Sequence, residues 1–277
     1  MEHMIRLDQA LVERGLCESR ERAKRAILAG QVRVNGQPAR KPSDSVKPDD
    51  ELKLDAGQKY VSRGGHKLEH ALEHFQLDVN GLTALDLGAS TGGFTDCLLQ
   101  RGAAKVFAVD VGRGQLAWIL RQDRRVVVME KTNARFLRPE HFGGTSSTSP
   151  QSEHFQTKSV TRGTRPSEKE IAFTGVDLIT IDCSFISLRK ILPAAVRLLK
   201  ADGKIIALIK PQFEAGKAEA DKGRGVITDA AIHDRVIREL RDFVSMQAGL
   251  CWRSVIESPL LGPAGNKEFL VLIEKTR

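Results

Sequence analysis

Hydrophobic and polar positions divide the chain into a short leading segment and a longer segment with a different pattern. In residues 6–54, apolar residues recur twice at helical spacing, and short alternating stretches follow, one of which ends in Asn35-Gly36. This pattern predicts a small α+β domain over residues 1–56, with two helices and a few short strands. Residues 57–62 are expected to form a linker.

Beyond residue 62, single helices alternate with strands. Such alternation predicts βαβ units, so we expect residues 63–277 to form an α/β domain with a Rossmann-like sheet. The expected strands are 83–87, 105–109, 126–129, 176–181, 204–209, 252–256 and 268–274, and the expected helices are 67–75, 94–100, 187–199 and 230–244. No helix separates the last two strands, which predicts an antiparallel final strand.

Residues 143–170 interrupt this alternation with Ser, Thr, Gly, Gln and charged residues. Such a composition buries too little apolar surface to order itself, and therefore predicts a disordered insertion. Its low complexity favours an inert loop over a functional lid.

Several features of the sequence restrict the class of protein. The longest apolar stretches are far shorter than the roughly 18 residues that a membrane helix needs. The first eleven residues carry charges where a signal peptide needs an apolar run. The four cysteines are scattered, without a paired spacing or clustered histidines, so we expect reduced thiols and no metal site. We therefore expect a cytoplasmic protein with no membrane partner.

Charge points to an anionic partner. The formal net charge is +8, and residues 20–41 contain seven bases and one acid. A basic helix alone is most often a solvated face, so the order of the residues has to decide between the two interpretations.

Three motifs follow one another in this segment: Arg6-Leu7-Asp8-x-x-Leu11, Ser19-Arg20-x-x-Ala23-x-x-x-Ile27 and Gly30-x-Val32-x-Val34-Asn35-Gly36. Their order and spacing resemble the S-four-type RNA-binding domain. The resemblance implies that the basic second helix and the turn after it lie against folded RNA, mainly through phosphate contacts. The residues that it assigns to RNA are Arg6, Arg20, Lys24, Arg25 and Arg33.

A glycine-rich loop follows the first strand of the sheet, with the sequence Asp86-Leu87-Gly88-Ala89-Ser90-Thr91-Gly92-Gly93-Phe94. Glycines let the backbone approach a ligand, and the next helix offers unpaired N–H groups. A turn needed only for packing is one alternative. A nicotinamide dinucleotide site is another, but the G-x-G-x-x-G spacing is absent.

The spacing of this loop resembles the S-adenosylmethionine loop of class I methyltransferases. The resemblance implies a Rossmann-like methyltransferase fold and assigns cofactor contacts to Asp86, Gly88, Ser90, Gly92, Gly93 and Phe94. It also places Asp110, at the end of the next strand, at the ribose hydroxyls of the cofactor, and Asn133 at its adenine.

Four more charged residues lie at or near the ends of predicted elements: Lys67, Asp182, Lys210 and Glu268. They resemble the Lys-Asp-Lys-Glu tetrad of FtsJ-like ribose 2′-O-methyltransferases. With the leading domain included, nearly the whole chain is similar to the TlyA family, which is often labelled hemolysin but understood as rRNA 2′-O-methyltransferases. The resemblance implies an S-adenosylmethionine-dependent enzyme whose partner is ribosomal RNA or a ribosomal subunit.

The tetrad also has a chemical rationale of its own. A ribose 2′-hydroxyl is a weak nucleophile, so a base must accept its proton during attack on the sulfonium methyl group. A free lysine has a pKa of about 10.4, so a lysine base needs surroundings that favour its neutral form, such as a second cation and partial burial. We assign Lys210 as the base and Lys67 as the neighbouring cation. Asp182 would orient Lys210 near the methionine end of the cofactor, and Glu268 would fix Lys67.

Other interpretations remain open at this point. The four residues could form two structural ion pairs. The chain could be a non-catalytic RNA-binding or ribosome-assembly protein, although no tetrad residue is missing. A membrane-lytic protein is the weakest alternative, because the sequence has no apolar or strongly amphipathic lytic segment.

Overall fold

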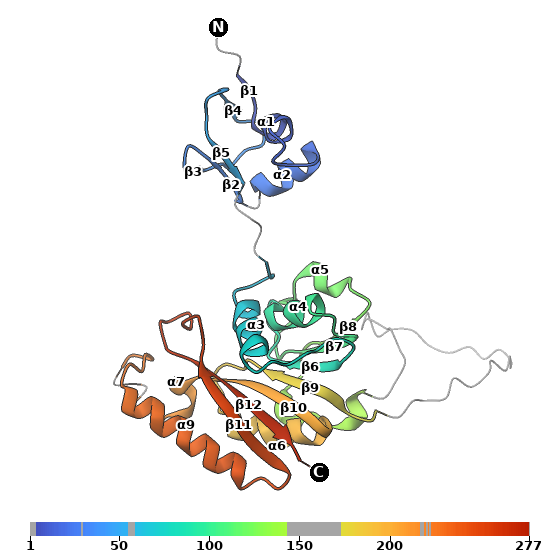
Figure 1. Ribbon diagram of the computed structural model, residues 1–277, viewed down its shortest axis with the longest axis vertical. Helices are drawn as coiled ribbons and strands as arrows, with labels where there is room; N and C mark the ends of the chain where they lie inside the picture. Colours follow the sequence, from blue (N-terminus) through green and yellow to red (C-terminus); the bar gives the residue numbers. More distant parts are fainter. Residues whose placement is uncertain are drawn as a thin grey trace, which may run out of the picture. The chain divides into compact units, whose positions relative to one another are not determined.

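The protein has two compact units, residues Met1–Lys59 and Tyr60–Arg277 (Figure 1). The structure is a computed structural model that describes residues 4–28, 30–54, 59–142, 173–216, 219, 221 and 223–276. The predicted insertion at residues 143–170 lies outside the described residues. Residues 60–62, expected in the linker, belong to the second unit, because the side chain of Tyr60 is 1% exposed and packs in its core.

In the first unit, two helices cover short antiparallel strands. The helices are α1 (Leu7–Glu13) and α2 (Arg20–Leu28), and their apolar residues at three- and four-residue spacing form one buried cluster with the strands. β2 (Val32–Val34) pairs with β3 (Gln37–Pro38) and β5 (Leu52–Leu54), while β1 (Ile5–Arg6) pairs with β4 (Ser45–Val46). Asn35 and Gly36 have positive φ angles of 50° and 78° and form the tight turn between β2 and β3.

A seven-stranded sheet with the order β11-β12-β10-β9-β6-β7-β8 forms the second unit. The strands are β6 (Thr83–Leu87), β7 (Lys105–Val109), β8 (Val126–Met129), β9 (Val176–Ile181), β10 (Leu199–Ile209), β11 (Leu250–Glu257) and β12 (Phe269–Lys275). Strands β8, β7, β6, β9 and β10 are parallel, and β12 runs antiparallel to both β10 and β11. The predicted Rossmann-like α/β fold and the antiparallel final strand are confirmed.

Helices cover both faces of this sheet (Figure 1). α3 (Gly64–His74), α4 (Gly93–Gln100) and α5 (Trp118–Arg121) share one apolar cluster with one set of strand residues. α6 (Leu188–Leu198) and α9 (Ala230–Ser245) share another with the alternate set. Because successive strand residues point to opposite faces, the apolar runs in the central strands supply both layers.

The chain order reverses beside β6, whose neighbours are β7 and β9. In open α/β sheets, ligands bind where the strand order reverses, outside the carboxyl ends of the strands. This topology places the glycine-rich loop after β6 at the position expected of a binding crevice. Three short helices complete the second unit: α7 (Pro211–Glu214), η1 (Ala134–Phe136) and η2 (Pro139–Phe142).

Close packing between Tyr60 and α3 holds the start of the second unit. A β-carbon built on Gly65 would lie 2.2 Å from Cγ of Tyr60, so the aromatic ring occupies the space of a side chain at this position. At Gly64 the nearest atom would be Oγ of Ser62 at 3.5 Å, an ordinary contact. A side chain is therefore excluded at Gly65 but can be accommodated at Gly64.

We expect Gly65→Ala to lower the free energy of unfolding by about 1–3 kcal/mol, because the rigid ring of Tyr60 must move to admit the methyl group. Gly64→Ala is the matched control and should leave stability unchanged or slightly raised. Thermal or urea unfolding of the two variants measures the difference. Equal stabilities would show that the Tyr60 ring does not constrain this helix.

Candidate active site

The glycine-rich loop after β6 lies directly against the end of β9. Leu87 pairs with Ile181, and the backbone N–H of Asp182 donates to the carbonyl of Leu87 at 2.9 Å. A β-carbon on Gly88, which has a φ of +84°, would lie 2.7 Å from the carbonyl oxygen of Asp182. Only glycine allows this approach, and as a result Asp182 lies beside the loop.

Asp86 lies inside the protein rather than at the surface of the loop. Its carboxylate is 0% exposed and accepts hydrogen bonds from the hydroxyl groups of Thr95 at 2.7 Å and Thr180 at 2.9 Å. Burial raises the pKa of Asp86 from 3.8 to about 6, although the two threonines act in the opposite direction. Asp86 thus ties β6, α4 and β9 together below the loop.

Other residues of the loop also face the protein interior. A β-carbon on Gly92 would lie 2.3 Å from Leu120, and one on Gly93 would lie 2.3 Å from the hydroxyl of Ser62. The side chain of Phe94 is 3% exposed. At these three positions the structure shows that the residues are needed for packing. Packing was the alternative to ligand binding in the interpretation of this loop.

Ser90 and Asp110 are joined across the loop. The carboxylate of Asp110, just after β7, accepts the backbone N–H of Ser90 at 2.8 Å and that of Gly112 at 2.7 Å. Ser90 itself has a positive φ of 49°. Asn133 is exposed at the start of η1, where its side chain accepts the backbone N–H of Arg135 at 3.1 Å.

Lys67 and Glu268 form a buried ion pair. Nζ of Lys67, on α3, lies 2.5 Å from Oε2 of Glu268, and the two side chains are 10% and 1% exposed. The second carboxylate oxygen, Oε1, is buried without a hydrogen-bond partner in the described part of the chain. A β-carbon on Gly262 would lie 2.5 Å from this oxygen, so the glycine leaves room for the carboxylate.

Lys210 and Asp182 form a second ion pair. Nζ of Lys210 lies 2.6 Å from Oδ1 of Asp182 and donates a hydrogen bond to the hydroxyl of Ser184 at 2.9 Å. The Lys210 side chain is 10% exposed and that of Asp182 is 23% exposed. A partly exposed carboxylate therefore holds a lysine that is almost enclosed.

Strand register brings both ion pairs to one edge of the sheet. Lys210 follows β10, Asp182 follows β9, and Glu268 precedes the antiparallel β12, in which Phe269 pairs with Ile209. All four tetrad residues therefore lie at the edge that carries the glycine-rich loop, with Lys67 joined through Glu268. This edge therefore carries two lysines, each paired with its own carboxylate, beside the glycine-rich loop that packs against the end of β9.

Two aromatic residues near Lys210 were not assigned from the sequence. The side chain of Phe185 is 90% exposed, its backbone φ is +63°, and its ring centroid lies 5.0 Å from that of Phe213. An exposed aromatic residue in left-handed backbone is unfavourable for folding, and such strain clusters at functional sites. Periodicity could not reveal it, because the signal is conformational.

The predicted RNA-binding bases of the first unit divide into two groups. Arg6 and Arg20 both form ion pairs with Asp8, whose side chain is 0% exposed, at 3.0 and 3.1 Å. The hydrogen bond from Arg6 is the largest cause that lowers the pKa of Asp8. Lys24 and Arg33 are half-buried and Arg25 is exposed.

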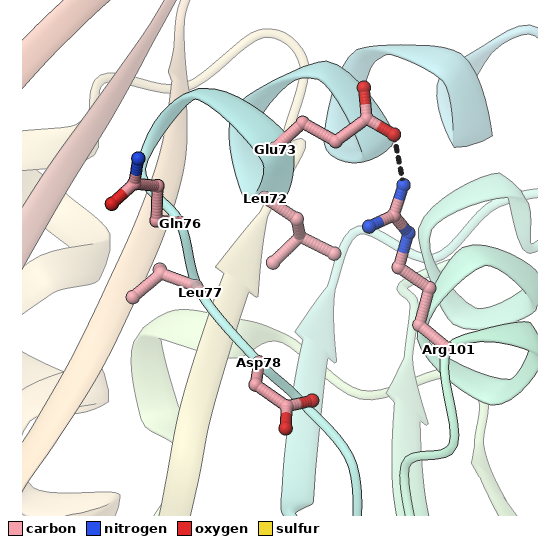
Figure 2. Close-up of a pocket in the computed structure, with 6 residues that line it drawn as sticks. All are labelled: Leu72, Glu73, Gln76, Leu77, Asp78 and Arg101. Atoms are coloured by element: carbon pink, nitrogen blue, oxygen red, sulfur yellow. Dashed lines mark hydrogen bonds and ion pairs between the residues drawn. The ribbon is translucent and has the colours of Figure 1, made fainter.

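An open hollow lies at the opposite edge of the sheet, before β6 and β7 (Figure 2). It is lined by Leu72, Glu73, Gln76, Leu77, Asp78 and Arg101. Arg101 forms ion pairs with Glu73 and Glu69, so its charge is already neutralised. None of the tetrad residues lines this hollow.

Comparison with known families agrees with this geometry. Residues 60–275 match the FtsJ-like methyltransferase family, and residues 5–52 match the S4 domain. The chain belongs to the FtsJ-like methyltransferase family. The two matched ranges correspond to the two units of the structure.

Relatives of this FtsJ-like methyltransferase cover nearly its whole length, and the resemblance to the TlyA family is confirmed. The 16S/23S rRNA (cytidine-2′-O)-methyltransferase TlyA of Mycobacterium tuberculosis is 44% identical over 98% of this chain and 90% of that protein. Hemolysin A of Brachyspira hyodysenteriae is 37% identical over 96% of this chain and 98% of that protein. A solved structure described as a hemolysin, from Streptococcus thermophilus, is 40% identical, with a TM-score of 0.66, over all of this chain and 90% of that one.

The structure adds two findings about the class of this FtsJ-like methyltransferase. In the described part of the chain, no helix is long and apolar enough to cross a bilayer. The four cysteines are free; Cys17 and Cys97 are buried, and Cys183 and Cys251 are half-buried.

The buried carboxylate of Asp86 predicts a pH-dependent stability difference. A carboxyl group whose pKa is raised by folding stabilises the protein fully below pH 4 and loses that contribution as the pH rises through about 6. We expect the free energy of unfolding of the wild type, relative to Asp86→Asn, to fall by about 2 kcal/mol between pH 4 and pH 7. Urea unfolding of both proteins across this range measures it, and a difference independent of pH would contradict the burial of a titrating carboxyl.

Proposed function

We propose that this protein transfers a methyl group from S-adenosylmethionine to a ribose 2′-hydroxyl of ribosomal RNA. The observation that carries the proposal is the pair of enclosed lysines, Lys67 and Lys210, each held by a carboxylate at the edge of the sheet that carries the glycine-rich loop. The name of the M. tuberculosis relative favours a cytidine as the target and ribosomal RNA as the substrate. Such a substrate would place the protein in the cytoplasm.

The residues around the loop fit S-adenosylmethionine, which would supply a methyl group on a positively charged sulfur. Because Gly88 has no side chain, the backbone of the loop can lie directly against Asp182. The carboxylate of Asp110 is fixed by two backbone N–H groups and keeps acceptor capacity for hydroxyl groups. Asp86, Gly92, Gly93 and Phe94 would support the site from within, because the structure buries them, while Ser90 and Asn133 would face the cofactor.

Lys210 is the residue that we assign to remove the proton of the 2′-hydroxyl. Once the ammonium of the ion pair has released its proton to solvent, the neutral amine would accept the proton of the 2′-hydroxyl as the ribose oxygen attacks, and Asp182, 2.6 Å away, would stabilise the ammonium that forms again. Asp182 and Ser184 fix the position of Nζ, so the base is oriented before substrate binds. Lys67, held by Glu268, would supply positive charge near the developing oxyanion.

Phe185 and Phe213 offer a surface for the base of the target nucleotide. A nucleotide that leaves the stack of folded RNA can bring its ribose to an enclosed lysine, and aromatic rings then replace the lost stacking. Phe185 is connected to Lys210 through the adjacent Ser184. Its exposure of 90% leaves its ring available to a ligand.

RNA docking is assigned to the S4 unit, where Lys24, Arg25 and Arg33 are the bases proposed to contact phosphates. Arg6 and Arg20 would contribute in a different way, because their ion pairs with buried Asp8 fix the start of α1 against α2. Part of their charge is thereby neutralised.

Substitution of Lys210 tests the assignment of the base. We expect Lys210→Ala to reduce methyl transfer at least about a hundredfold, the low end of what a positioned base contributes. Lys210→Arg should be equally inactive, because guanidinium keeps its proton at neutral pH. Transfer of labelled methyl groups to ribosomal subunits from cells that lack this protein measures the rate.

The control for both variants is calorimetric binding of S-adenosylmethionine, which should stay within about threefold of wild type. An active Lys210→Arg protein would show that this residue serves only as a positive charge. Wild-type protein that binds the cofactor but methylates neither subunit would instead favour a ribosome-assembly role.

Charge removal on the S4 unit tests the docking surface. We expect Lys24→Gln combined with Arg25→Gln to weaken binding to ribosomal subunits and to reduce the slope of log affinity against log salt by about 1.4–1.8, the value for two phosphate contacts. Binding measured between 50 and 200 mM salt gives the slope. An unchanged slope would remove these two residues from the RNA interface.

A further inference from the structure

One exposed arginine is held in a strained turn close to the loop that carries Glu268. Arg224 and the next residue, Gly225, have φ angles of +51° and +84°, and the N–H of Val226 donates to the carbonyl of Gly223 at 2.9 Å. These φ values are those of a type I′ turn, in which glycine or asparagine is usual at both central positions. Left-handed backbone is unfavourable for an arginine, so the surrounding structure must maintain it.

A buried side-chain amide anchors this turn. Asn266 is 1% exposed, its Nδ2 donates to the carbonyl of Gly225 at 2.8 Å, and its Oδ1 accepts the N–H of Ile227 at 2.8 Å. Ile227 is buried, and its carbonyl lies 2.9 Å from Nε2 of His233 on α9. Both ends of the amide are therefore used to fix the backbone on one side of Arg224.

The anchoring residue belongs to the loop that positions the tetrad. Asn266 precedes Glu268 by two residues in the connection between β11 and β12, and its carbonyl accepts the N–H of Gly262. Gly262 in turn packs against the carboxylate of Glu268. The turn of Arg224 and the ion pair of Lys67 are thus held by the same short loop.

The side chain of Arg224 is exposed and forms no ion pair in the described part of the chain. Its guanidinium is a permanently charged donor with a fork of N–H groups that matches phosphate oxygens. A fixed backbone reduces the entropy lost when such a side chain binds. Backbone strain that folding does not require is a feature of binding sites.

We propose that Arg224 binds a phosphodiester group of the RNA next to the target nucleotide. The inference rests on the proposed function, because the phosphate must arrive with the ribose that Lys210 deprotonates. Arg224 would fix the strand at one side of the enclosed lysines, independently of the S4 unit. Arg224 could instead bind the carboxylate of the methyl donor. Measurement of cofactor affinity distinguishes this partner from an RNA phosphate.

Two substitutions of Arg224 in the full-length protein test the proposal, with ribosomal subunits from cells that lack this protein as the probe. Arg224→Gln should raise KM for the subunits about fivefold and reduce the salt slope of binding by about 0.7–0.9, with kcat and the Kd for S-adenosylmethionine unchanged. Arg224→Gly should raise KM equally while Tm stays equal to or above that of the wild type, because glycine accepts the positive φ.

Matched controls lie at the opposite edge of the sheet. Arg197→Gln removes an exposed arginine in the last turn of α6 and should leave KM and the salt slope unchanged. Gln76→Gly relieves a positive φ of 53° at an exposed residue beside the hollow in Figure 2, and should leave KM unchanged. Arg197→Gln controls for the loss of a positive charge, and Gln76→Gly controls for the relief of backbone strain. An effect seen only in the Arg224 variants therefore reports the loss of the contact with RNA.

An unchanged KM and salt slope in Arg224→Gln would overturn the proposal. So would a lower Tm in Arg224→Gly, which would show that the arginine serves the fold. Weaker cofactor binding with unchanged subunit binding would assign the guanidinium to the methyl donor instead. A wild-type protein that binds subunits without methylating them would refute the proposed function, while the salt slope would still decide the role of Arg224.

Discussion

Pairing of charge inside a nearly closed site is the constraint on which the rest of this structure depends. Lys67 and Lys210 are each about nine-tenths enclosed, and an ammonium group taken from water without a partner costs several kcal/mol. Each lysine therefore needs a carboxylate within contact, and the sheet delivers one from β9 and one from the loop before β12. The antiparallel direction of β12 matters here, because it places Glu268 at the same edge as the carboxyl ends of its neighbours.

The fold could be predicted from the sequence because its signals are repetitive. Alternation of apolar strands with single helices indicated the parallel sheet, and the missing helix before the last strand indicated the antiparallel β12. The limits of helices were less accurate: α3 begins at Gly64 rather than Lys67. Glycine is normally unfavourable in a helix, but at Gly65 the ring of Tyr60 requires it. Tyr60 was expected in a linker because its burial depends on contacts distant in sequence.

The candidate site was predicted in outline, but the roles within it differ from residue to residue. The four charged residues were recognised as a set, and the structure brings them to one edge. Asp86, Gly92 and Phe94 lie inside the protein, which a linear motif does not reveal, because residues that touch a ligand and residues that support them occur side by side. Phe185 and Arg224 were missed, since only backbone angles mark them, and no sequence pattern reports a positive φ in an arginine or a phenylalanine.

The packing of the glycine-rich loop affects how such loops should be used as markers of activity. Gly92 and Gly93 are demanded by Leu120 and Ser62, whatever the loop binds. A descendant of this protein that had lost its substrate would keep these glycines for as long as it kept its core. Selection for chemistry would be visible at Lys67 and Lys210, whose burial is a continuing cost to stability. A screen of genomes for working enzymes of this architecture should therefore give the two lysines more weight than the glycines.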